Sequence, residues 1–385
     1  MIRKTILFFM VFFLCMTNVL ATTSLGGPGL IYTQSAKVLP KGYLEWFAGT
    51  RYFGKIASFK TNQRAFTLWD VQGLFSLNYG LNPHLTIGLS PILYQDINRE
   101  GGNFWQGKAN LPDDIFVSVK FGSFSALENP FAFGGLMTVR IPTANKHNII
   151  YEPYSSGSIE VGITGLASYY SKPAMPDMGW SAHLNVGYLN HNDVGRSLSN
   201  SPLDAAAQSM SSEILFSQGF LYPMDTFSFS AEITARYFLV RPPFSAYSRE
   251  YVSYLTFGVY YNPYRWLTLE MGVDLRLASG QDLTSYQYIP SPPTEDFPNY
   301  PTWRGLLGMK LGILPFSLFQ SEDAQLRQKA KDRKAILEKM MDQQSSTENA
   351  EQELSRIQAE RKKVEDELER LRKLLEAEKQ KEKKE

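Results

Sequence analysis

The amino-acid sequence predicts an all-β transmembrane barrel of about 12 antiparallel strands, followed by a C-terminal α-helical coiled-coil tail. Three observations lead to this fold class. Apolar and polar residues alternate with period two through most of residues 42–316, which indicates strands with one apolar and one polar face. The connections between these strands are alternately short and long. Residues 321–385 lack aromatic residues, Pro and Gly, and carry 17 Lys/Arg and 17 Asp/Glu.

The N-terminal residues 1–21 are expected to be a secretory signal peptide. Two basic residues precede an apolar run over residues 6–16, and small or aliphatic residues at 19–21 offer a cleavage site. The apolar run is shorter than the roughly 20 residues that a spanning helix needs, which disfavours a membrane anchor. Residues 22–41 are then expected to form a periplasmic segment that precedes the barrel.

The barrel is expected to cover residues 42–316. Most of its strands are about ten or more residues long, which is long for a soluble sheet and suits a tilted membrane-spanning strand. In residues 267–278 every odd position is apolar, while Glu270, Asp274 and Arg276 lie on the other face. The predicted strands are 43–54, 65–79, 85–96, 113–122, 131–142, 158–170, 179–190, 212–222, 227–238, 251–262, 267–278 and 302–314.

The connections favour a membrane barrel over a soluble β-sandwich. Short connections such as residues 80–84 and 223–226 carry Asn-Pro and Pro-x-Asp sequences that are typical of tight turns. Longer loops such as residues 97–112 and 279–301 lie between them. In a soluble sandwich, nothing requires short and long connections to alternate along the chain. An even number of strands places both termini in the periplasm, so we expect a protein of the cell outer membrane with a periplasmic tail.

The charged residues of the polar faces are the candidate functional residues, because they would line the lumen. They could bind or pass a polar solute, or they could pair and fill a narrow barrel as a polar core; the sequence leaves both possibilities open. The spacing of Glu270, Asp274 and Arg276 places them on one wall, close enough to pair. The lumen-lining candidates are Asp70, Asp114, Lys120, Arg140, Glu160, Glu232, Arg236, Glu270, Asp274, Arg276, Arg304 and Lys310, with Glu45, Arg51 and Glu213 on the same faces.

The sequence shows no pattern of catalytic, metal-binding or cofactor chemistry. None of the four histidines has metal-ligand spacing, and no phosphate-binding loop is present. The only cysteine, Cys15, lies in the expected signal peptide. His191 and Ser197 weakly resemble the His/Ser site of barrel phospholipases, but they do not lie on predicted strands as that site requires. We therefore expect no enzyme, no cofactor and no metal, and the net charge of +1 gives no reason to expect nucleic acid.

Two stretches resemble known outer-membrane barrels. The last predicted strand contains GMKLGI, whose Gly308, Leu311 and Ile313 resemble the signal that the barrel assembly machinery reads, although Leu306 stands where a polar residue is usual. The stretch PGLIYTQSAKVLPKG is similar to the segment before the barrel in Gram-negative outer-membrane barrel proteins, some related to phenol-pathway-associated transporters and others to OmpA-like proteins. The resemblance covers about residues 27–315 and implies outer-membrane lipid and the barrel assembly machinery as partners. No OmpA-like domain follows, so cell-wall binding is not implied.

The tail is predicted to form a coiled coil over about three heptads. A solvated single helix held by charge pairs is the alternative, and a capping box at Ser345 and Glu348 leaves one helix or a helical hairpin open. The seam residues are Leu354, Ile357, Val364, Leu368, Leu371 and Leu375. We expect this seam to support self-association or to bind an envelope protein.

Two functions fit these expectations. The first is a narrow channel or transporter for small solutes. The alternative is a structural envelope anchor, whose closed barrel displays the tail for oligomerisation or partner binding.

Overall fold

The computed structural model describes most of the predicted barrel and a few residues of the tail. The described residues are 27–58, 64–99, 102–103, 114–125, 129–143, 147–173, 175–197, 206–287, 299–316 and, in the tail, 357, 359, 361–363 and 365. The chain divides into two units, one ending at Phe319 and the other beginning at Gln320. The signal peptide lies outside the described residues, and of the coiled-coil seam only Ile357 is described, as an exposed helical residue.

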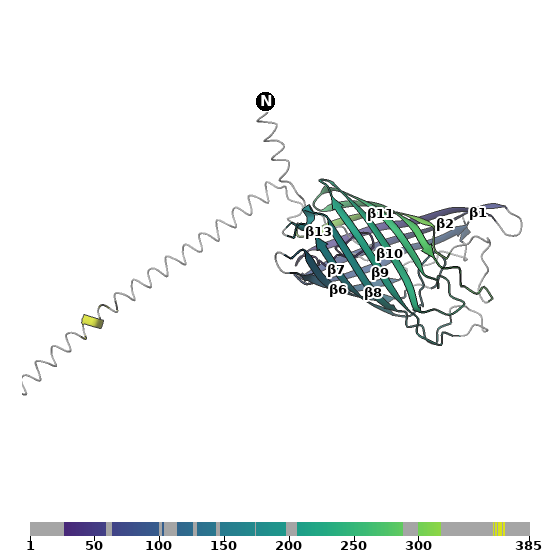
Figure 1. The fold of residues 1–385 in the computed structure, drawn as a ribbon, viewed down its shortest axis with the longest axis horizontal. Helices are drawn as coiled ribbons and strands as arrows, with labels where there is room; N and C mark the ends of the chain where they lie inside the picture. Colours follow the sequence, from purple (N-terminus) through teal and green to yellow (C-terminus); the bar gives the residue numbers. More distant parts are fainter. Residues whose placement is uncertain are drawn as a thin grey trace, which may run out of the picture. The chain divides into compact units, whose positions relative to one another are not determined.

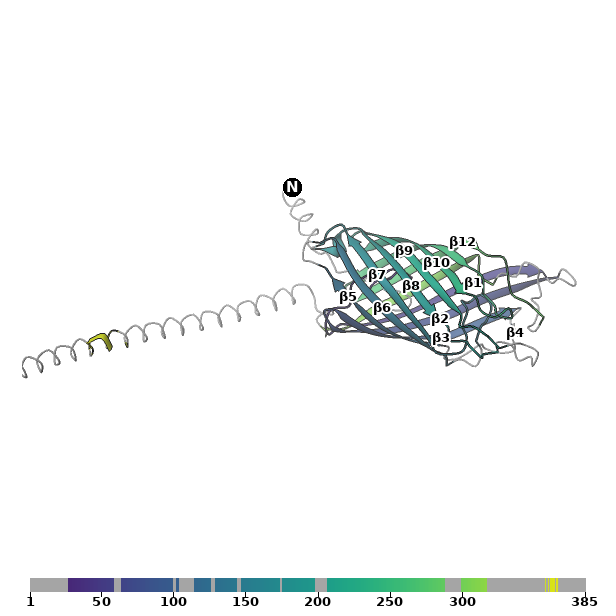
Figure 2. The same cartoon turned by 60° about the horizontal axis from the view of Figure 1, so that its bottom comes forward.

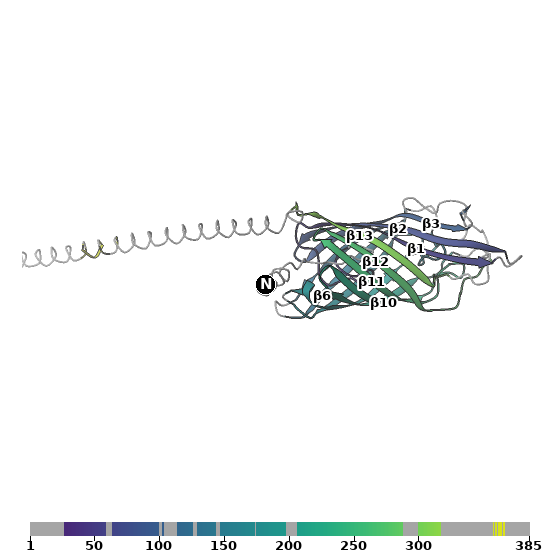
Figure 3. The same cartoon turned by 90° about the horizontal axis from the view of Figure 1, so that it is seen from above.

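A single antiparallel sheet closes into a barrel, because β1 pairs with β13 on one side and with β2 on the other. Figures 2 and 3 show the strands inclined around the barrel. The barrel strands are β1 Leu44–Ser58, β2 Ala65–Asn82, β3 Leu85–Arg99, β5 Ile115–Phe124, β6 Phe131–Ile141, β7 Glu160–Tyr170, β8 Ser181–Asn190, β9 Ser212–Pro223, β10 Phe227–Val240, β11 Val252–Tyr264, β12 Leu267–Ser279 and β13 Trp303–Leu314.

These twelve strands confirm the predicted barrel, and each overlaps its predicted range. The sequence did not predict β4 (Gly102–Asn103), which pairs only with the end of β3. Two residues are too few to give a periodic signal. One short 3₁₀-helix, η1 (Pro176–Met178), lies between β7 and β8. Among the described residues, no helix is both long and apolar enough to cross a membrane.

Large apolar side chains cover the outside of the barrel. Phe133 on β6, Ile163 on β7 and Met271 on β12 are each about half exposed, at 55%, 54% and 57%. On the other face of β7 and β12 lie buried Glu160 and Asp274. A soluble protein has the opposite arrangement. The apolar outer face and polar inner face are those of an outer-membrane barrel.

The two ends of the barrel differ in their connections. In Figure 1 the short turns lie at the left-hand end and the long loops at the right-hand end. Described parts of the long loops fold over their end of the lumen. Ile150 and Tyr151 pack with Phe53 of β1 and Leu68 of β2, and Tyr154 packs with Phe238 of β10. The lumen is therefore covered at the long-loop end by packed side chains.

Candidate functional site

Residues 27–39, which we call the hairpin, lie inside the barrel near the short turns. A bridge pairs Gly29 with Gln34, and the Leu30 N–H donates to the Thr33 carbonyl at 2.8 Å, which closes the tip of the hairpin. The sequence placed residues 22–41 in a periplasmic segment. From Gly27 to Leu39 the segment lies in the lumen instead, because its apolar side chains are buried there and its backbone finds polar partners on the wall.

Polar side chains of the wall bind the backbone of the hairpin. Glu232 of β10 accepts hydrogen bonds from three successive backbone N–H groups, those of Ile31 (2.8 Å), Tyr32 (3.0 Å) and Thr33 (2.7 Å). Asn185 of β8 accepts from the Gln34 N–H at 2.7 Å and donates to its carbonyl at 2.9 Å. These contacts satisfy backbone groups that burial would otherwise leave without water.

Two further wall residues extend this binding around the barrel. Lys120 of β5 donates to the Pro28 carbonyl at 2.8 Å and to Gln34 Oε1 at 2.9 Å. Ser168 of β7 accepts from the Ala36 N–H at 2.8 Å. Two of the lumen-lining candidates, Lys120 and Glu232, therefore bind the protein's own hairpin.

Glycines on the wall make room for the hairpin. A Cβ at Gly219 would lie 2.3 Å from Leu30 Cδ1, and a Cβ at Gly272 would lie 2.6 Å from Ile31 Cδ1. At Gly122 the added atom would lie 2.1 Å from the backbone oxygen of Ala36. Backbone cannot yield as a flexible side chain can, so Gly122 is the position where a side chain is least tolerable.

We expect Gly122→Val to displace the hairpin from the lumen. In the wild-type protein Lys37 is half-buried, with its Nζ 4.2 Å from the centre of the Tyr170 ring. Limited trypsin digestion of the folded variant should therefore cleave after Lys37 much faster than in wild type, as read by mass spectrometry. The control is Gly54→Val, because a Cβ there meets nothing within 4 Å. Equal cleavage of the two variants would show that the hairpin does not need this space.

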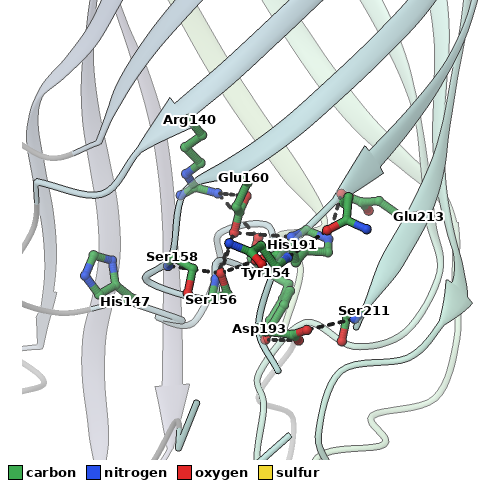
Figure 4. Close-up of polar contacts among 12 residues, drawn as sticks. Arg140, His147, Tyr154, Ser156, Ser158, Glu160, His191, Asp193, Ser211 and Glu213 are labelled. Atoms are coloured by element: carbon green, nitrogen blue, oxygen red, sulfur yellow. Dashed lines mark hydrogen bonds and ion pairs between the residues drawn. The ribbon is translucent and has the colours of Figure 1, made fainter. Parts of the chain in front are cut away.

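A row of alternating charges runs across strands β6 to β10 near the long-loop end. Figure 4 shows most of it, with His191 between two carboxylates. The row consists of Arg140 (β6), Glu160 (β7), His191 (after β8), Glu213 (β9) and Arg236 (β10). Arg140 Nη1 lies 3.4 Å from Glu160, and Arg236 Nε donates to Glu213 at 3.0 Å. Asp114 adds a second carboxylate on Arg140, with an Nε–Oδ2 distance of 2.6 Å.

His191 is fully buried, and each of its ring nitrogens faces a carboxylate. Nδ1 lies 3.2 Å from Glu160 Oε1 and Nε2 lies 3.5 Å from Glu213 Oε1. Burial by itself lowers the pKa of His191, but the two carboxylates outweigh it and raise this pKa to about 9. His191 is therefore a cation at neutral pH and completes the alternation of charge.

The same cluster ties the long loops to the barrel (Figure 4). Asp193 accepts from the Tyr154 hydroxyl at 2.9 Å and from the Ser211 N–H at 2.8 Å. The Ser156 hydroxyl donates to the backbone oxygen of His191 at 2.6 Å. Because both His191 nitrogens face carboxylates and Ser197 is exposed, the geometry gives no support to a phospholipase-like His/Ser pair.

An ion pair between β12 and β13 also binds the hairpin. Asp274 of β12 accepts from Arg304 Nε at 3.0 Å and from the Tyr32 hydroxyl at 2.6 Å. Asp274 pairs with Arg304 and not with Arg276, because Arg304 lies directly opposite Asp274 in the register of β12 and β13, closer than a residue two positions along the same strand. Arg276 Nη1 instead donates to the Tyr300 carbonyl at 2.7 Å.

The remaining lumen candidates lie elsewhere on the inner face. Asp70 is buried on β2, and Glu270 lies beside Gly308 of β13. Lys310 Nζ is 3.9 Å from Glu45. The sequence did not single out Tyr32, Tyr154, His191 or Asp193 for this site. The stretch PGLIYTQSAKVLPKG, which resembles the segment before the barrel in other outer-membrane barrels, was the only sign of the hairpin in the sequence, and it did not indicate entry into the lumen.

A chamber with a volume of about 330 Å³ lies between the hairpin and the long loops. The hairpin contributes Tyr32 and Gln34, and the loops contribute Glu152 and Tyr300. Four guanidinium groups also line the chamber, and each has a carboxylate partner: Arg51 with Glu152, Arg140 with Glu160, Arg236 with Glu213 and Arg304 with Asp274. No cluster of three or more potential metal ligands occurs in the described part of the chain.

The barrel is similar to solved outer-membrane channels. An outer membrane channel from Pseudomonas putida F1 aligns with a TM-score of 0.44 and 13% identity, over 72% of this chain and 98% of that one. The NanC porin aligns with a TM-score of 0.43 and 10% identity, over 70% and 98%. A variant of the TodX monoaromatic hydrocarbon channel aligns with a TM-score of 0.35 and 10% identity, over 77% and 97%. No protein-family model and no curated protein matches the sequence.

Proposed function

We propose that this protein is an outer-membrane channel or transporter for small solutes, and that it is not an enzyme. The chamber between the hairpin and the long loops carries the proposal. A barrel with an apolar outer face and a chamber of about 330 Å³ inside it can hold a small molecule between the two sides of a membrane.

The lining of the chamber favours an uncharged solute. Each guanidinium at its surface already has a carboxylate partner, and breaking a buried pair is costly. Leu74, Phe116 and Leu215 supply apolar surface between these pairs. A small neutral molecule with both apolar and hydrogen-bonding groups makes contacts with this lining without disturbing it.

Solute entry into proteoliposomes tests this proposal. We expect vesicles that contain the full-length protein to swell several-fold faster in arabinose than in sodium gluconate or lysine chloride, because charged solutes meet only paired charges in the chamber. Protein-free vesicles are the control. Swelling at the protein-free rate in every solute would contradict the channel, and equal rates for neutral and charged solutes would contradict the preference.

The covered lumen also favours a second candidate, the structural envelope anchor. Both the hairpin and the long loops lie across the lumen, so a barrel that never opens is consistent with the geometry. The same vesicles separate the two candidates. An anchor predicts no solute entry with wild-type protein, and none with a variant whose hairpin is released.

A further inference from the structure

We propose that the hairpin is a displaceable gate and that Glu232 is the latch that holds it closed. The inference rests on the proposed channel function, because a gate needs a solute to admit. It goes beyond that function by assigning the closed state to one segment and one carboxylate.

The hairpin extends from one side of the lumen to the other. Leu39 is bound on one wall, where its N–H donates to Thr86 of β3 at 2.9 Å. The tip reaches β10, six strands away around the twelve-strand barrel, where Glu232 accepts hydrogen bonds from the Ile31 and Thr33 N–H groups. A solute that moves along the lumen must therefore displace the hairpin or pass through it.

The barrel does not depend on the hairpin for its strand pairing. The sheet closes through β1 and β13, with nine aligned residue pairs from Leu44 with Leu314 to Tyr52 with Gly305. Within the described residues, the hairpin pairs only with itself, through Gly29 and Gln34. Its contacts with the wall are separate hydrogen bonds and side-chain packing, so the hairpin can leave while the barrel stays closed.

Glu232 is the wall residue that binds three successive backbone groups at the tip of the hairpin. It is 1% exposed and accepts three backbone hydrogen bonds at the tip, farthest from the connection to β1. Hydrogen bonds to a charged acceptor are the stronger kind. Release of this carboxylate removes three hydrogen bonds at the tip at once and weakens its hold on the wall, while the connection at the other end keeps the segment attached to the barrel.

The connection between hairpin and barrel is a tight turn that is bonded to the wall. Gly42 has a φ of +81°, a conformation that favours glycine, and a Cβ there would meet nothing within 4 Å. The turn is fixed by two backbone hydrogen bonds, from Gly42 N–H to the Gly80 carbonyl at 2.8 Å and from Tyr43 N–H to the Pro40 carbonyl at 3.1 Å. These bonds keep the turn and β1 in place, so the hairpin stays attached to the barrel at this end when its tip leaves the wall.

A disulfide between the hairpin and β9 tests whether the hairpin must move for a solute to pass. A Cβ at Gly219 would lie 3.2 Å from Thr33 Cβ, close to the usual disulfide separation of about 3.5–4.5 Å, and only the end of the Leu30 side chain must move. The processed chain is expected to have no other cysteine. We expect the double variant T33C/G219C to form the disulfide in vesicles, to lose arabinose entry when oxidised and to regain it when reduced. Failure to cross-link, or equal entry in both states, would overturn the gate.

Glu232→Gln tests the latch. Glutamine keeps the size of the side chain but turns an NH₂ group toward one of the hairpin N–H groups, and it removes the charge. In a T33C background we expect a membrane-impermeant maleimide to label residue 33 about tenfold faster, and we expect faster arabinose entry. The matched control is Glu45→Gln, another buried lumen glutamate, whose partner is Lys310.

The two readouts separate the gate from the channel. Equal labelling of the two glutamine variants would overturn the latch, whatever the flux. Faster labelling without solute entry in any variant would establish that the hairpin is released and would refute the channel function on which the gate rests.

Discussion

Glu213→Ala is expected to lower the free energy of unfolding of the barrel by about 3–5 kcal/mol, because it leaves half-buried Arg236 without its carboxylate and buried His191 with one carboxylate in place of two. Glu213 is 0% exposed and binds both Arg236 and His191. Its removal interrupts the row of alternating charges in the middle. Urea titration in detergent micelles, followed by the gel mobility of unheated samples, measures this loss.

Two variants control for this result. Glu213→Gln keeps the shape and part of the hydrogen bonding, so its loss should be smaller than that of Glu213→Ala. Asp225→Ala removes a carboxylate from an exposed position in the turn between β9 and β10, and it should change the unfolding free energy by less than about 0.5 kcal/mol. A loss for Glu213→Ala no larger than for Asp225→Ala would mean that the row contributes nothing to stability.

The stability of the folded protein should fall as pH rises, because His191 loses its proton. Its pKa is raised to about 9 in the folded protein, above the ordinary value of 6.5. The folded state therefore holds this proton more tightly than the unfolded state does. The stabilisation is complete below about pH 6.5, declines above it and is lost once pH rises through about 9, for a total of ~3 kcal/mol.

His191→Asn isolates this contribution. Asparagine does not titrate, so the variant should be less stable than wild type at pH 6, and the difference should close by about pH 10. Urea midpoints for both proteins at intervals across this range give the comparison, in which the other titrating groups cancel. Parallel curves for the two proteins would show that His191 is not the group responsible.

The sequence by itself determined the barrel wall. In β12 the apolar residues from Leu267 to Leu277 face outward, and the charges between them face inward, as their alternation predicted. Each strand encodes its own two faces in consecutive residues, and each turn encodes its own reversal. The fold class, the strand number and the approximate bounds follow from these local signals.

Only the tertiary structure decided what the lumen contains. The Ile31 N–H and the Glu232 carboxylate are 201 positions apart in the chain, and no local pattern relates them. The partner of Asp274 is Arg304 and not Arg276, because cross-strand register sets which side chains face each other. Spacing along one strand shows which charged side chains face the lumen. Closure of the sheet determines which of these side chains pair with each other and which of them bind the hairpin.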